Sequence, residues 1–173
     1  MQLKIILIGV LVGCSYLIGD YLYKAYTKRH KQLNDLIRIL EIIRMDLSFG
    51  LYTLEEIFER VGQRKEYSLS IFFKSMSLDL HKNSSKILDE IVKDNIDILT
   101  KETYLQNKEV DEVKKLILTL GKSDILSQER MIDLSIENLK KLTDESKDDI
   151  NKKGLLYKKL TTFIGIGIGI ILI

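Results

Sequence analysis

The sequence predicts an all-α protein, an antiparallel bundle of about six helices flanked by an N-terminal and a C-terminal membrane segment. Three observations support this fold class. The chain has 173 residues and no proline, so nothing interrupts long helices. Apolar runs lie at both ends, over residues 3–23 and 160–173. Between them, apolar residues recur at spacings of three and four, which is typical of the buried face of a helix.

The first element, residues 1–23, is predicted to be a transmembrane helix. Its apolar run from Leu3 to Tyr23 is long enough to cross roughly 30 Å of hydrocarbon at 1.5 Å per residue. The alternative is a signal sequence with a lipidated Cys14, because Leu11–Cys14 resembles a lipobox. A retained anchor is favoured, since only Lys4 precedes the run and the run continues past Cys14.

The last element, residues 154–173, is predicted to be a transmembrane or membrane-inserted helix. Its continuous apolar run begins at Leu160 and would make only about 21 Å of helix, which is marginal for a span. Lys158 and Lys159 can extend it by placing their ammonium groups at the interface. A shallow or tilted insertion is the alternative.

Basic residues edge both apolar runs on the side that faces the middle of the chain. Such residues remain on the cytoplasmic side of a span. The central domain, residues 24–153, is therefore predicted to be cytoplasmic, with both termini outside. The residues concerned are Lys24, Lys28, Arg29, Lys31, Lys152, Lys153, Lys158 and Lys159.

Each apolar segment carries two glycines four residues apart: Gly9 and Gly13 in the first, Gly165 and Gly169 in the second. Glycine at this spacing lets helix backbones approach closely in lipid. We therefore expect the two segments either to pack against each other or to seed homo-oligomers through these faces. The alternative is that glycine is simply frequent in membrane helices.

The central domain begins with a helix that continues from the first span and stops near Gly50. Thr53 and Glu56 then form a predicted capping box, which starts a short helix ending near Gly62. The apolar face of the first of these helices is marked by Leu33, Leu36, Leu40, Ile43 and Leu47.

Four further helices are predicted from the same spacing. The third covers 69–80, and a break with a cap follows at 83–85. The fourth covers 87–99, and the fifth covers 110–120 with Gly121 just after its end. Ser123 or Asp124 caps the sixth, which grades into a charged, solvated stalk over 140–153. Its expected inward residues are Met131, Ile132, Leu134, Leu139 and Leu142.

The residues that commonly carry chemistry form no recognisable constellation. Gly121-Lys122-Ser123 resembles the end of a P-loop, but it follows a helix and lacks the first glycine. His81 near Asp79 is interpreted as a surface histidine. We therefore expect no catalytic residue, metal site or cofactor. The net charge of +2 does not indicate nucleic-acid binding.

Acidic residues concentrate on the predicted second helix, as Glu55, Glu56 and Glu59. Near a helix N-terminus such residues stabilise the positive end of the helix dipole. They also present a surface that suits a basic partner. Both interpretations remain open from the sequence.

Two blocks of residues resemble the stage III sporulation protein AB family. The first is Leu40-Glu41 followed by Asp46-Leu47-Ser48-Phe49-Gly50. The second is Leu120-Gly121 followed by Asp124 and Gln128. Their order between two membrane segments covers nearly the whole chain. Thr53 stands where the family usually has proline, and threonine is itself a good helix cap.

This resemblance implies a helical domain like the cytoplasmic domain of type II secretion and type IV pilus platform proteins. It implies a non-enzymatic subunit of the channel-like complex that endospore-forming bacteria build between mother cell and forespore. Its expected location is the mother-cell membrane facing the forespore. Its expected partners are a secretion-type ATPase, stage III sporulation protein AA, and other subunits of the complex. The faces around Asp46 and Gly50, and around Glu55, Glu56 and Glu59, are the candidate docking surfaces.

A membrane-bound helical signalling or regulatory module is the alternative function. In such a module, the apolar face of the first helix is expected to continue from the first span into an output domain. Here the chain instead returns to a second apolar segment, which favours the platform interpretation.

Overall fold

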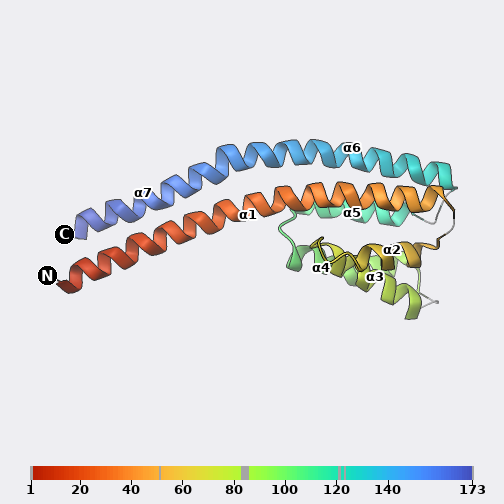
Figure 1. The fold of residues 1–173 in the computed structure, drawn as a ribbon, viewed down its shortest axis with the longest axis horizontal. Helices are drawn as coiled ribbons and strands as arrows, with labels where there is room; N and C mark the ends of the chain where they lie inside the picture. Colours follow the sequence, from red (N-terminus) through yellow and green to blue (C-terminus); the bar gives the residue numbers. More distant parts are fainter. Residues whose placement is uncertain (1, 51, 83–85, 121, 123, 173) are drawn as a thin grey trace. The chain divides into compact units, whose positions relative to one another are not determined.

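The computed structural model describes residues 2–50, 52–82, 86–120, 122 and 124–172, and every regular element among them is helical (Figure 1). The predictions of an all-α fold and of an apolar helix at each end are confirmed. The chain forms two compact units, Met1–His30 with Asp144–Ile173, and Lys31–Thr143. The elements are α1 (Gln2–Ser48), α2 (Leu54–Gly62), α3 (Ser70–Lys82), α4 (Leu88–Glu102), α5 (Asn107–Thr119), α6 (Ile125–Asp149), the π-helical turn η1 (Ile150–Gly154) and α7 (Leu155–Leu172).

Helix α1 is continuous for 47 residues and ends where the sequence predicts. Gly50 has a φ of +63°, a left-handed conformation that glycine adopts without steric cost and that commonly ends helices. The Gly50 N–H donates to the Leu47 carbonyl at 2.9 Å. The chain can therefore turn sharply into α2.

Helix α2 begins with the predicted capping box. The Glu56 N–H donates to Thr53 Oγ1 at 3.3 Å, and the Thr53 N–H donates to Glu56 Oε2 at 2.7 Å. Two N–H groups that would lack partners at the helix start are satisfied in this way. The hydrogen bonds from Thr53 also hold the pKa of the Glu56 carboxyl below its usual value.

The core of the 31–143 unit is built from one face of each of its helices. Helix α3 packs on α2 and α4, and α4 packs on α5. Three phenylalanines meet at the α2–α3 contact, with ring centroids 5.5 Å apart for Phe58 and Phe73 and 5.2 Å for Phe72 and Phe73. Other fully buried members are Leu33, Leu36, Ile39, Ile57, Val61, Met76, Val92, Leu99, Leu120, Ile132 and Leu139.

The segment between α4 and α5 is fixed to α1 by a buried side chain. The Tyr104 N–H donates to Gln32 Oε1 at 2.7 Å, and Gln32 is buried. A backbone donor in a connecting segment needs such a partner when it leaves water. This contact positions α5 for packing through Val110 and Val113.

The inward face of α6 differs in part from the prediction. Asp124 caps the helix, because its Oδ1 accepts from the Ser127 N–H at 3.0 Å. Ile132 and Leu139 are buried as expected and Leu142 is partly buried, but Met131 and Leu134 are 37% and 56% exposed, so that part of the prediction was wrong. At 100° per residue these two positions fall off the buried stripe. The stripe consists of Gln128, Ile132, Ser135, Ile136 and Leu139.

Several predicted features fall on residues that are not described. They are the break at 83–85, Gly121 and Ser123. The predicted charged stalk is helical through α6 and η1, but Ser146 within it is only 1% exposed.

The other unit pairs the first part of α1 with α7, and the start of α1 and the end of α7 lie at its same end (Figure 1). By length and composition, the helices at both termini are apolar enough to cross a membrane. The turn η1 brings Gly154 against α1, where a β-carbon on Gly154 would lie 3.3 Å from the Tyr23 ring. This packing leads directly into α7.

Candidate functional site

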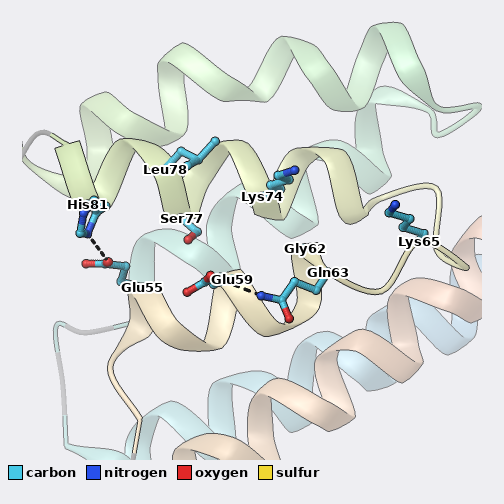
Figure 2. A pocket seen from close by; sticks show the side chains of 9 residues that line it. All are labelled: Glu55, Glu59, Gly62, Gln63, Lys65, Lys74, Ser77, Leu78 and His81. Atoms are coloured by element: carbon cyan, nitrogen blue, oxygen red, sulfur yellow. Dashed lines mark hydrogen bonds and ion pairs between the residues drawn. The ribbon is translucent and has the colours of Figure 1, made fainter.

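A groove between α2 and α3 is the candidate functional site (Figure 2). The two helices approach closely at Gly62, where a β-carbon would lie 2.7 Å from both the N and Cα atoms of Lys74. Only glycine permits that approach. The groove holds about 500 Å³ and is lined by Glu55, Glu59, Gly62, Gln63, Lys65, Lys74, Ser77, Leu78 and His81.

Glu55 and Glu59 share one face of α2 and both line this groove (Figure 2). Glu55 Oε1 lies 2.8 Å from His81 Nδ1 on α3. Glu59 Oε1 accepts a hydrogen bond from Gln63 Nε2 at 3.3 Å. Their spacing of four residues accounts for the shared face, because residues i and i+4 are neighbours on a helix.

Glu56 does not belong to this face. Its carboxylate accepts from both the N–H and the Oγ1–H of Thr53, at 2.7 and 2.9 Å. The structure thus separates the three acidic residues into one capping residue and two groove residues. The predicted capping box is confirmed for Glu56, whereas the sequence left both roles open for Glu55 and Glu59.

The groove also carries basic residues: His81, which the sequence predicts to be a surface histidine, and two lysines that the sequence did not single out. Lys65 and Lys74 line it beyond Glu59, and His81 closes the end near Glu55 (Figure 2). Their positions depend on how α3 packs on α2, and no spacing along the chain reports that packing. The groove therefore has an acidic part and a basic part rather than one charge throughout.

Asp46 and Gly50, the other predicted docking residues, lie at the α1–α2 connection. Asp46 is only 7% exposed, and its Oδ1 lies 3.7 Å from Arg60 Nη1. The Arg60 guanidinium lies 4.4 Å from the centroid of the Tyr52 ring. Asp46 is thus buried at the connection, whereas Gly50 is exposed. A docking role for these two residues stays a prediction.

The predicted glycine pairs behave differently from each other. A β-carbon on Gly165 would lie 2.5 Å from Ser15, and one on Gly169 would lie 3.0 Å from Ile8. Both residues therefore lie at the contact between α7 and α1. In contrast, Gly9 and Gly13 have no atom within 4 Å of such a β-carbon, so they take no part in this contact. Contact with another copy through Gly9 and Gly13 stays a prediction.

On α1, Gly19 also lies close to α7, because a β-carbon there would meet Thr161 Oγ1 and would lie 3.0 Å from the Lys158 carbonyl oxygen. Next to it, Asp20 is bound by Lys158 at 2.7 Å and by Lys24 at 2.8 Å. The Lys158 ammonium also lies 5.4 Å from the ring centroids of Tyr16 and Tyr23. An acidic residue inside a predicted span was the available sequence signal, because such groups are usually paired.

A second ionic contact joins α1 to the end of α6. Arg29 is only 3% exposed, and its Nη1 lies 2.9 Å from Asp149 Oδ2. Lys153 Nζ lies 2.7 Å from Asp149 Oδ1. These hydrogen bonds, the one from Lys153 first, hold the pKa of the Asp149 carboxyl below its usual value although burial opposes them.

The described residues contain no group of three His, Cys, Asp or Glu side chains placed to hold a metal ion. Cys14 is exposed on α1.

Comparison with known proteins points to one family. Residues 4–173 match the family model described as stage III sporulation protein AB. The chain is 24% identical to a Bacillus subtilis (strain 168) protein named stage III sporulation protein AB, over 99% of this chain and 98% of that protein. No solved structure matches it. The chain therefore belongs to the stage III sporulation protein AB family.

Proposed function

We propose that this protein is a non-enzymatic platform subunit of a sporulation complex that crosses the envelope. It is held in the mother-cell membrane facing the forespore, with its central helices in the cytoplasm and both termini outside. The supporting observation is that the helices at both ends are long and apolar enough to span, while residues 31–143 form a core of their own. Basic residues on the inner flank of both apolar runs support the orientation.

The proposed partner is a cytoplasmic secretion-type ATPase, of the stage III sporulation protein AA type, in a complex with the other subunits. The α2–α3 groove is the proposed docking surface, because Glu55 and Glu59 offer carboxylates to a basic side chain of the partner. On α2, the neighbouring residues Ile57 and Phe58 are fully buried in the core. The bundle can therefore transmit force from the partner as a rigid body, as a platform requires.

The test is a pull-down of the ATPase by the full chain in non-ionic detergent. Glu55→Lys together with Glu59→Lys is expected to lower binding at least tenfold, because two attractive contacts become repulsive. Glu56 is left unchanged because it caps α2. Asp111→Lys, which reverses the charge of one exposed acidic residue on α5, is the control for a charge reversal away from the groove and is expected to bind normally.

Two outcomes contradict the proposal at different points. Normal binding by the double variant would exclude the groove as the docking surface. Absence of binding by the unaltered chain, with the ATPase folded, would contradict the platform function itself.

A further inference from the structure

A second groove lies in the unit formed by the terminal helices. It holds about 440 Å³ between Tyr23 of α1 and the first turns of α7. Its remaining lining residues are Leu155, Lys158, Lys159, Thr162 and Phe163. Two of these carry ammonium groups, and Leu155 and Phe163 are apolar side chains that are 40% and 68% exposed.

The charge around this groove is positive. Asp20 supplies one carboxylate, while Lys24, Lys158 and Lys159 supply three ammonium groups. Lys24 and Lys158 both bind Asp20. Lys159 is exposed and forms no ion pair with any residue that the structure describes. The groove therefore presents one lysine that is available to an anionic ligand.

The order of polar and apolar residues along α7 matches the boundary of a bilayer. The lysines are at positions 158 and 159, and the continuous apolar run starts at Leu160. Phe163 lies one helical turn beyond Lys159, toward the apolar end. Tyr23 occupies the boundary on α1, a position that aromatic residues with a polar group favour. A ligand here would meet ammonium groups at one end and apolar surface at the other.

We propose that this groove binds one anionic phospholipid, with its phosphate at Lys159 and the start of its acyl chain along Phe163. This inference rests on the proposed membrane insertion, because only then does the groove lie at headgroup depth. Basic pockets beside membrane helices on the cytoplasmic face are suited to anionic headgroups. Free phosphate shares the anionic chemistry, but it leaves the apolar part of the groove unused.

The lipid would also join the two helices. Tyr23 belongs to α1 and Lys159 to α7, so a molecule that touches both adds a contact beside the Asp20–Lys158 pair. Because this contact forms only when anionic lipid is present, the pairing of the terminal helices would be more stable in an anionic membrane.

The test uses the full chain in non-ionic detergent and counts bound lipids by native mass spectrometry. Phosphatidylglycerol is titrated against phosphatidylcholine with the same acyl chains. The unaltered chain is expected to bind one molecule of phosphatidylglycerol in preference to phosphatidylcholine. Lys159→Gln is expected to weaken that binding about fivefold, the effect of one lysine near an anionic headgroup.

Lys152→Gln is the matched control, since it removes the same charge from an exposed position that does not line the groove. Its affinity for phosphatidylglycerol is expected to stay within about twofold. Equal losses in Lys152→Gln and Lys159→Gln would contradict a defined site. Competition by glycerol phosphate as strong as that by the intact lipid would assign the site to a free anion and overturn the proposal.

Carbonate extraction of the chain from phosphatidylcholine vesicles separates this inference from the proposed function. A chain that stays inserted but shows no preference for phosphatidylglycerol would contradict the lipid site alone. A chain that is extracted would contradict both the membrane platform and the lipid site.

Discussion

Asp149, the last residue of α6, is bound by two cationic side chains. Its two oxygens bind Lys153 and Arg29, and Arg29 is almost fully buried. Removing the partner of a buried charge is more costly than removing an exposed pair. Asp149 therefore makes a testable contribution to stability.

We expect Asp149→Asn to lower the free energy of unfolding by about 2 kcal/mol at pH 7. The pKa of Asp149 is lowered in the folded chain, so its contribution is fully present above the unfolded-state pKa of about 4. It is lost as the pH falls through the lowered folded-state pKa. Denaturant unfolding of the full chain in detergent, from pH 7 to pH 2, measures the difference.

Asp148→Asn is the control for this prediction. Asp148 pairs with Lys152 at 2.8 Å, but both side chains are more than half exposed, and such pairs contribute little. A difference between Asp149→Asn and the unaltered chain that stays constant down to pH 2 would contradict the linkage.

At the scale of elements, the α2–α3 contact depends on the absence of a side chain at Gly62. A β-carbon there would lie 2.7 Å from backbone atoms of Lys74, which cannot rotate away. We expect Gly62→Ala to destabilise the chain by about 2 kcal/mol, measured by thermal or denaturant unfolding.

Shortening the neighbouring side chain provides the control. Lys74→Ala combined with Gly62→Ala should not restore stability, because the backbone of Lys74 remains in place. Full recovery would mean that the long lysine side chain, rather than helix approach, limits the contact.

The α1–α7 contact gives a second prediction at this scale. Gly165 has Ser15 within 2.5 Å of its β-carbon position, whereas Gly13 has no neighbour within 4 Å. We expect Gly165→Ile to separate the helices and Gly13→Ile to leave them paired. Helix pairing can be measured as disulfide formation between Ile8→Cys and Gly169→Cys, because these two positions are adjacent. The chain also carries Cys14→Ser, so that no other thiol competes.

The disulfide yield should fall severalfold with Gly165→Ile and stay unchanged with Gly13→Ile. Equal yields in the two variants would contradict the contact. A higher-order crosslinked species that Gly13→Ile removes would instead support contact between copies through the Gly9 and Gly13 face.

At the scale of the whole molecule, the proposed topology places Lys4 outside and Lys82 in the cytoplasm. In a chain with Cys14→Ser, we expect Lys4→Cys to react with a membrane-impermeant maleimide on intact cells. Lys82→Cys should react only after lysis, because the inner flanks of both apolar runs are basic.

Labelling of both positions after lysis is the control for accessibility, since both residues are exposed. Labelling of Lys82→Cys on intact cells would contradict the proposed orientation.

Local signals determined much of this fold. Thr53 and Glu56 cap α2 through side chains three residues apart, and Gly50 ends α1 through its own backbone freedom. The spacing of Leu33, Leu36 and Leu40 identified a buried face, because residues three and four apart lie on the same side of a helix. Each of these features depends on residues within a few turns, so the sequence by itself was sufficient. The match of two blocks in order also identified the family.

Tertiary packing decided the sites. Glu55 meets His81 across two helices, Gly165 meets Ser15 rather than Gly13, and Asp149 meets Arg29 across 120 positions of the chain. Helix periodicity defines which residues share a face, but it does not determine the rotation of one helix against another. That rotation depends on the packing of side chains and backbone at each contact, which no spacing along a single helix records.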